Sequence, residues 1–154
     1  FRDMRLIPFL RRPDPMPPVQ FYEQLDPAVF VLRLVPGMRA DIIPLLAPHY
    51  RALVVESFGV GGLPGGEHGE MYARLQDWCT SGRLAVFTTQ VPHEGCDLAV
   101  YEVGRSVKEL PGVLEAKDMT PEAVAVKLMW ALGQTTDRAE AMRLFTTPVE
   151  WDIV

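Results

Sequence analysis

Residues 52–66 read Ala-Leu-Val-Val-Glu-Ser-Phe-Gly-Val-Gly-Gly-Leu-Pro-Gly-Gly, and this stretch decides the fold. Its first half predicts a strand over 53–58, because a run of aliphatic residues is typical of a strand buried on both faces of a sheet. Its second half carries five glycines within residues 59–66, so the backbone there can adopt positive φ and pass close to other groups. A helix is expected next, and a strand, a glycine-rich loop and a helix form the unit at which open α/β sheets bind ligands.

The glycines alone do not define a ligand. The spacing in Gly59-Val60-Gly61-Gly62 lacks the third glycine of a dinucleotide fingerprint, and the chain has no Gly-Lys-Ser/Thr phosphate loop. Taken by itself, the loop is better explained as a tight connection between a strand and a helix.

Strands and helices are expected to alternate along the rest of the chain. Strands are predicted at 29–35, 53–58 and 84–89, with 98–103 as a short strand or an extended loop. Helices are predicted at 41–50, 67–80 and 120–132, with one more after Asp137. This order predicts an α/β fold with three α/β/α layers and a small, mostly parallel, Rossmann-like sheet of about four strands. Residues 91–117 are expected to form a long irregular connection.

Capping signals support the last two helices. Thr120 is an expected N-cap followed by Pro121, and Gly133 is an expected stop. Asp137 with Glu140 has the spacing of a capping box.

Apolar spacing predicts which side chains face the core. In the helix at 67–80, one stripe contains Met71, Leu75, Trp78 and Cys79. Trp78 and Trp130 are expected in the core, whereas the position of Trp151 is left open.

The N-terminal residues differ in composition from the rest of the chain. Residues 1–20 contain five prolines, which disfavour helix and all but a short strand at 6–10. We expect 1–20 to be an interdomain linker or arm and 21–154 to be a single α/β domain.

Charge and composition exclude several classes of protein. The net charge of −5 and the pI near 5.2 argue against binding to nucleic acid or to an anionic membrane surface, since both need clustered basic residues. No apolar run is long enough to span a membrane. The two cysteines form no disulfide framework, which favours reduced thiols and a cytoplasmic location. The three histidines are dispersed, so neither a metal nor a cofactor is expected.

Four further segments, together with the glycine loop, resemble one family. Residues 56–64 resemble the segment that opens the small C-terminal domain of bacterial L-asparaginases of the cytosolic type (type I-like). In the same order, similar segments occur at 35–38 (Val-Pro-Gly-Met), 88–91 (Thr-Thr-Gln-Val), 101–104 (Tyr-Glu-Val-Gly) and 116–123 (Ala-Lys-Asp-Met-Thr-Pro-Glu-Ala).

The resemblance implies an amidohydrolase that converts L-asparagine and water to L-aspartate and ammonia. In that family the nucleophilic threonine lies in a Thr-Gly-Gly-Thr motif of a larger N-terminal domain, and this chain contains no such motif. We therefore expect no catalytic residue in this chain and no activity from it alone. The C-terminal domain is expected to complete the active site of a neighbouring subunit and to mediate a dimer or tetramer.

The resemblance also implies residues that close the substrate site. Gly61 and Gly62 lie in the loop that approaches the substrate, and Gly62 stands where some members carry an asparagine. Tyr101 and Glu102 lie in a second such loop, and Glu102 is the candidate that neutralises the substrate ammonium. Glu102 as a solvated or capping carboxylate is the alternative.

A possible regulatory site comprises Glu56, Thr88 and Thr89. Some members bind a second asparagine there through an arginine at the position of Glu56, so the resemblance implies that this site is absent or altered here. The alternative is that both threonines are ordinary sheet residues.

Other functions remain open from the sequence. Ser57, Cys96 and Asp97 are further polar candidates, although a cysteine near His93 is more often incidental than catalytic. The chain could also be a stand-alone amino-acid-binding or regulatory domain, an oligomerisation domain, or part of an asparaginase-like subunit of a tRNA-dependent amidotransferase.

Overall fold

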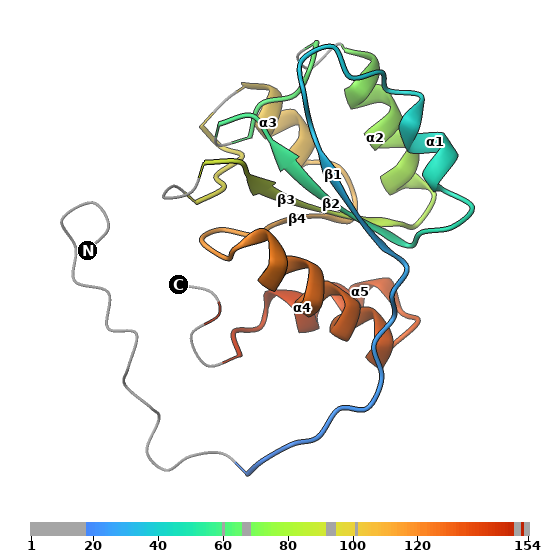
Figure 1. Cartoon of the computed structure of the whole chain (residues 1–154), viewed down its shortest axis with the longest axis vertical. Coiled ribbons are helices and arrows are strands. Elements are labelled where there is room, and N and C mark those ends of the chain that lie inside the picture. Colours follow the sequence, from blue (N-terminus) through green and yellow to red (C-terminus); the bar gives the residue numbers. More distant parts are fainter. Residues whose placement is uncertain are drawn as a thin grey trace, which may run out of the picture.

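The computed structural model describes residues 18–59, 61–65, 69–91, 95–100, 102–149 and 152. Within them, one sheet contains four parallel strands in the order β1-β2-β3-β4 (Figure 1). The strands are β1 (Val29–Arg33), β2 (Ala52–Ser57), β3 (Leu84–Thr89) and β4 (Val113–Glu115). The parallel sheet of about four strands predicted from the sequence is confirmed.

Helices cover both faces of the sheet. They are α1 (Ile42–Leu46), α2 (Glu70–Thr80), α3 (Glu102–Lys108), α4 (Pro121–Gln134) and α5 (Arg138–Thr146). The first three lie on one face, and α4 and α5 lie on the other (Figure 1). Each strand pairs with the next one in sequence, so crossovers of a single hand place α1, α2 and α3 on the same face. The helices after β4 then cover the remaining face. The three layers are as predicted.

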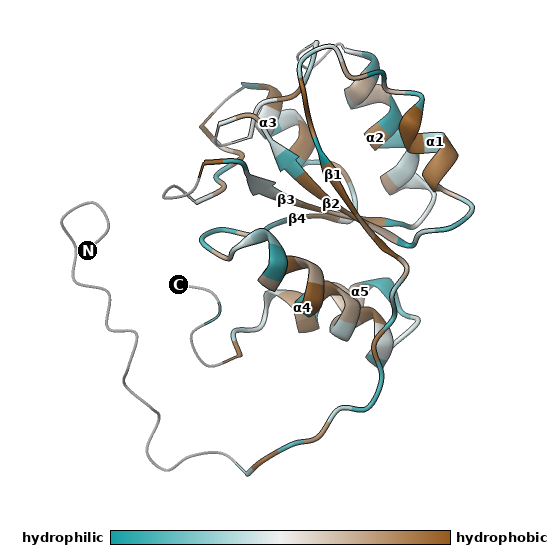
Figure 2. Ribbon diagram, viewed as in Figure 1, coloured by the Kyte–Doolittle hydropathy of each residue, from teal (hydrophilic) through white to brown (hydrophobic). Residues whose placement is uncertain are grey.

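The two central strands supply most of the core. All six residues of β2 and all six of β3 are buried, as the aliphatic runs predict. Their side chains alternate between two clusters, with Leu53 and Val55 facing α1–α3 and Val54 facing α4 and α5. The predicted apolar stripe of α2 is buried in the first cluster. Figure 2 shows hydrophobic residues along the central strands and a mixture of hydrophobic and hydrophilic residues along the helices.

The connection between β3 and α4 is more regular than predicted. Residues 98–100 lie in a turn, so the short strand considered at 98–103 is wrong; the structure has helix α3 and strand β4 instead. The strand β4 has three residues, too few for an alternating pattern to show in the sequence. Helix α3 contains Gly104, which normally disfavours helix and conceals the signal.

Gly133 was predicted to end a helix, but α4 continues to Gln134. A Cβ atom on Gly133 would lie 2.6 Å from the carbonyl oxygen of Gln24. The absence of a side chain at Gly133 therefore allows residues 18–28 to pass close to α4. In this segment the Tyr22 ring packs edge-on against the Trp130 ring, with the ring centroids 5.2 Å apart. Trp130 is partly buried at this periphery rather than in the core, unlike Trp78, which is 3% exposed.

Both N-cap predictions are confirmed. Thr120 Oγ1 accepts a hydrogen bond from Ala123 N, and Asp137 Oδ1 accepts one from Glu140 N at 2.7 Å. The capping box at α5 is only half formed, because the Glu140 carboxylate binds Arg143 instead of a backbone N–H. None of the helices in the described part of the chain is both long and apolar enough to cross a membrane.

Candidate functional site

A pocket of about 350 Å³ opens at the carboxyl ends of the strands, where parallel sheets bind ligands. We name it the carboxyl-edge pocket. The ends of β1, β2 and β3 and the start of α4 form it. Its lining comprises Arg33, Glu56, Thr88, Thr89, Gln90, Val91, Asp118, Met119, Thr120, Pro121 and Glu122. Glu56, Thr88 and Thr89, the possible regulatory residues, therefore lie together.

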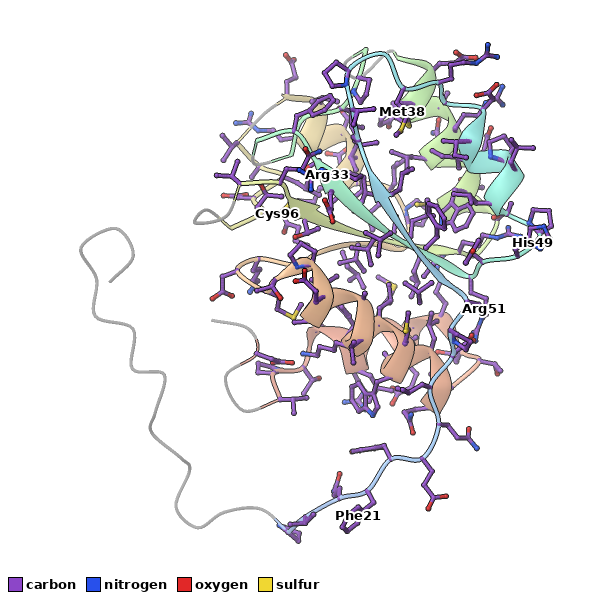
Figure 3. The ribbon with its side chains drawn as sticks, viewed as in Figure 1. Phe21, Arg33, Met38, His49, Arg51 and Cys96 are labelled. Carbon is purple, nitrogen blue, oxygen red and sulfur yellow. The ribbon has the colours of Figure 1, made fainter. Side chains whose placement is uncertain are left out.

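Strand register brings Arg33, Glu56 and Thr88 side by side. Arg33 is the register partner of Glu56, which in turn is the partner of Thr88. The Arg33 guanidinium lies 3.4 Å from the Glu56 carboxylate, whose side chain is 12% exposed. This ion pair supplies the partner that a mostly buried carboxylate needs. Arg33, which Figure 3 labels on β1, was not predicted as a site residue, although it is the only charge in its strand.

Hydroxyl groups at the strand ends have distinct environments. Ser57 Oγ donates a hydrogen bond of 2.8 Å to the carbonyl of Thr88, which identifies Ser57 as a structural residue. Thr89 Oγ1 donates to the carbonyl of Gly59 and accepts from Val91 N at 3.0 Å. Thr89 thus ties the pocket to the glycine loop. Thr88 Oγ1 is buried and has no hydrogen-bond partner within the described residues.

Gln90 fastens the ends of β1 and β2 to β3. Its Nε2 donates to the carbonyl of Leu34 at 2.7 Å and to that of Glu56 at 2.8 Å. Sequence reasoning missed this role, since a single glutamine after a strand carries no recognisable signal.

The carboxyl-edge pocket is lined by more acidic than basic side chains. Three carboxylates, of Glu56, Asp118 and Glu122, line it with one guanidinium, of Arg33. Such a pocket favours a ligand with an ammonium group over a simple anion.

The glycine loop packs against the loop that leads to α3. A Cβ atom on Gly61 would lie 3.0 Å from Leu98 Cδ2, and Gly62 N donates a hydrogen bond of 2.7 Å to the carbonyl of Phe58. Glu102 is exposed in the first turn of α3. The structure therefore brings Gly61 against Leu98 in the segment that precedes α3, whereas the close contacts of Gly62 are with Phe58 in its own loop. Glu102 belongs to α3 and not to the loop that the resemblance implied. Tyr101, the fourth predicted site-closing residue, lies outside the described residues.

Glu115 on β4 holds the second loop in place. Its carboxylate accepts a hydrogen bond of 2.8 Å from Leu98 N and pairs with the Lys108 ammonium at 2.9 Å. Cys96 N donates to the carbonyl of Lys117 at 2.7 Å. The described part of the predicted irregular connection is thus tied to the sheet and to α3.

The Cys96 thiol is poorly suited to nucleophilic chemistry. Burial raises its pKa to about 12, and the nearby carboxylates of Glu115 and Asp97 add to this effect. The thiol is therefore protonated at neutral pH, whereas a nucleophile requires the thiolate. His93 lies outside the described residues, and no cluster of three or more potential metal ligands occurs among the residues that are described.

A parallel three-layer domain with polar groups gathered at the carboxyl ends of its strands has the architecture in which open α/β sheets bind ligands. The model of the glutaminase/asparaginase C-terminal domain family matches residues 28–145, and the chain belongs to this family.

Two types of relative are similar in sequence. The chain is 37% identical over 133 residues to an L-asparaginase of Thermococcus kodakarensis, covering 86% of this chain and 40% of that protein. It is 36% identical over 140 residues to a glutamyl-tRNA(Gln) amidotransferase subunit of Metallosphaera sedula, covering 90% of this chain and 30% of the relative. The chain therefore spans two-fifths or less of the length of these relatives.

Solved structures agree with the sequence comparison. The thermostable L-asparaginase from Thermococcus kodakarensis superimposes with a TM-score of 0.77 at 36% identity, covering 85% of this chain and 39% of that one. L-asparaginase I from Vibrio cholerae superimposes with a TM-score of 0.73 at 25% identity, covering 84% and 38% of the two chains.

Proposed function

We propose that the full-length protein is an L-asparaginase that hydrolyses L-asparagine to L-aspartate and ammonia. The observation that carries this proposal is the joint match to the Thermococcus kodakarensis L-asparaginase, at 37% identity in sequence and a TM-score of 0.77 in structure. A cytoplasmic location and the bacterial type I-like character belong to the same proposal, the latter supported by the likeness to L-asparaginase I of Vibrio cholerae.

In this proposal the domain completes an active site whose nucleophile lies in the N-terminal part of the protein. The residues that would touch substrate are Gly61 and Gly62 of the glycine loop and, further along the chain, Tyr101 and Glu102. Glu102 would neutralise the substrate ammonium across a subunit interface, which its exposure in the first turn of α3 supports. Gly62 has no side-chain amide, so any polar contact from this position is limited to its backbone.

Mixing two inactive variants of the full-length protein tests whether the domain serves a neighbouring subunit. One variant carries Glu102→Ala, and the other is inactivated at the nucleophile of the N-terminal part. If each site combines groups from two subunits, random pairing of equal amounts restores about one quarter of the wild-type activity in a dimer. Activity that stays at the sum of the two separate variants would contradict intersubunit closure.

A second candidate function is that of a subunit of glutamyl-tRNA(Gln) amidotransferase. Several relatives with that name match this chain, at up to 36% identity over 140 residues. The full-length protein separates the two candidates, because an asparaginase releases ammonia from free L-asparagine without any tRNA. Ammonia release that depends on glutamyl-tRNA(Gln) would favour the amidotransferase.

We further propose that the carboxyl-edge pocket is an altered regulatory site. Glu56 stands where some members of the resembled family carry an arginine, so the carboxylate group of a regulatory asparagine would lack that cationic partner, and the pocket has more carboxylates than cations. The full-length enzyme should therefore show a hyperbolic dependence of rate on L-asparagine. A sigmoidal dependence that Thr88→Val abolishes would show that the pocket still binds a regulatory asparagine.

A further inference from the structure

A second cavity, of about 430 Å³, lies at the opposite edge of the sheet, where β2 and β3 begin. We name it the amino-edge cavity. Figure 3 labels His49 and Arg51 on this side of the molecule, away from Cys96. Arg51 directly precedes β2, and Arg83 directly precedes β3. The lining comprises Ala47, Pro48, His49, Tyr50, Arg51, Ser81, Gly82, Arg83, Leu84, Leu132, Thr136 and Arg138.

The ionisable side chains that line the amino-edge cavity are all basic, apart from the phenol of Tyr50. It contains three arginines and one histidine and no carboxylate, although the chain as a whole has a net charge of −5. Arg51 is neutralised by Asp26, at 2.6 Å. Arg83 and Arg138 form no ion pair within the described residues.

Backbone carbonyl groups explain why arginines are tolerated here. Arg83 donates to the carbonyl of Ala47 at 2.7 Å and to that of Tyr50 at 3.3 Å, and Arg138 donates to that of Cys79 at 3.1 Å. Ala47 and Cys79 lie at the carboxyl ends of α1 and α2, where positive charge is favourable. These carbonyl groups carry only partial charge, so two full positive charges remain beside the cavity.

The Arg138 guanidinium retains most of its hydrogen-bonding capacity. A guanidinium has five N–H donors, and only one protein hydrogen bond of Arg138 occurs among the described residues. Arginine binds phosphate and carboxylate groups through paired N–H donors. A partly enclosed site next to two uncompensated guanidinium groups is suited to such an oxyanion, and its volume is that of a small-molecule site.

We propose that the amino-edge cavity binds a small anionic molecule that carries a phosphate or carboxylate group. Arg138 and Arg83 supply the charge, and the exposed His49 adds a further donor at the rim. This inference does not depend on the proposed asparaginase activity, because the cavity and the carboxyl-edge pocket lie at opposite edges of the sheet.

Calorimetric titration of the full chain tests the proposal, with pyrophosphate as the phosphate probe and citrate as the carboxylate probe, at constant ionic strength. Trp78 provides a second readout, since its ring lies 5.2 Å from the Arg83 guanidinium carbon. The expected result is saturable binding of at least one probe with a change in tryptophan fluorescence. The tighter probe identifies the class of anion.

Arg138→Gln should weaken binding about tenfold or more, as expected for the loss of a charged hydrogen bond. Arg74→Gln is the matched control, because Arg74 is a half-exposed arginine of α2 that pairs with Asp77 and does not line the cavity. His49→Gln is the second variant in case Arg138→Gln does not fold. His49 is exposed, so its replacement should leave the fold intact, and the loss of its side-chain donor at the rim should weaken binding. Failure of both probes to saturate, or equal weakening by Arg74→Gln, would overturn the proposal.

Discussion

At the scale of single residues, glycines allow the backbone segments around the candidate site to approach closely. A Cβ atom on Gly104 in α3 would lie 2.3 Å from the carbonyl oxygen of Leu98. The same Leu98 packs on Gly61 and is held by Glu115. The position of the loop before Glu102 therefore depends on the absence of a side chain at Gly104.

Replacing Gly104 by alanine should destabilise the protein, although the same change in an ordinary helix stabilises it by about 1 kcal/mol. The clash with the carbonyl of Leu98 should reverse this sign, at a cost of about 2 kcal/mol, in the range of overpacked cores. Gly37→Ala is the control, because Gly37 has φ of +80° but no atom within 4 Å of an added Cβ. Its cost is backbone strain alone, about 1 kcal/mol. Chemical denaturation measures both, and a stabilised Gly104→Ala variant would refute the close contact.

Lys127 is a buried cation of α4 that holds the C-terminal residues. Its side chain is 6% exposed, and its ammonium lies 2.7 Å from the Asp152 carboxylate and donates to the carbonyl of Thr147 at 2.9 Å. Lys127→Met should cost about 1–3 kcal/mol of unfolding free energy, because both acceptors lose their partner. Asp152→Asn removes only the ion pair and should cost less. Thermal unfolding measures both variants. An equal loss of stability in the two would contradict the prediction that the hydrogen bond of Lys127 to Thr147 adds to the ion pair.

The thiols of Cys79 and Cys96 should be unreactive in the folded protein. Burial raises the pKa of Cys79 to about 11 and that of Cys96 to about 12, from an ordinary value of 9.0. A thiol whose pKa is higher in the folded state stabilises that state below the ordinary pKa, and this contribution is lost as the pH rises above it. Stability should therefore fall between about pH 9 and 12. A thiol reagent at pH 8 should label both cysteines only after denaturant is added, and rapid labelling of the native protein would contradict their burial.

At the scale of secondary-structure elements, side-chain N-caps stabilise the starts of α4 and α5. Thr120→Ala should destabilise the protein by about 1 kcal/mol, because the N-cap bond to the backbone of α4 is lost. Thr136→Ala is the matched control, since Thr136 is also exposed and caps no helix. Thermal unfolding compares the two variants, and equal shifts would show that the hydroxyl of Thr120 does not act as a cap.

The elements with strong local signals were predictable from the sequence. Strands β2 and β3 follow from their aliphatic runs, and α4 follows from Thr120 and Pro121. Helix α3 and strand β4 were not predictable, because Gly104 is present for a tertiary contact and β4 is only three residues long. A tertiary contact also explains why Gly133 does not end α4 as predicted. Its role depends on the close approach of the carbonyl of Gln24, which lies more than 100 residues earlier in the chain.

The candidate site was partly predictable. Glu56, Thr88 and Thr89 lie at strand ends, so their meeting follows from a parallel sheet. Arg33 and Gln90 were missed, because their roles depend on strand register and on contacts with backbone carbonyls. Neither property leaves a pattern in a single sequence.

At the scale of the whole molecule, the domain has two separate polar regions at opposite edges of its sheet. The carboxyl edge carries an acidic pocket next to the glycine loop, and the amino edge carries a basic cavity. Substitutions at one edge should leave the other unaffected, because distant sites without shared partners are usually independent. Arg138→Gln should therefore leave the rate of asparagine hydrolysis by the full-length protein unchanged, and a large fall in this rate would show coupling between the edges.

The most direct test of the central claim is the release of ammonia from L-asparagine, measured for the full-length protein and for this chain alone. We predict turnover by the full-length protein in the absence of tRNA and none by the isolated chain, since the proposed nucleophile lies outside it. Turnover by the isolated chain, or a folded full-length protein that leaves L-asparagine intact, would contradict the account.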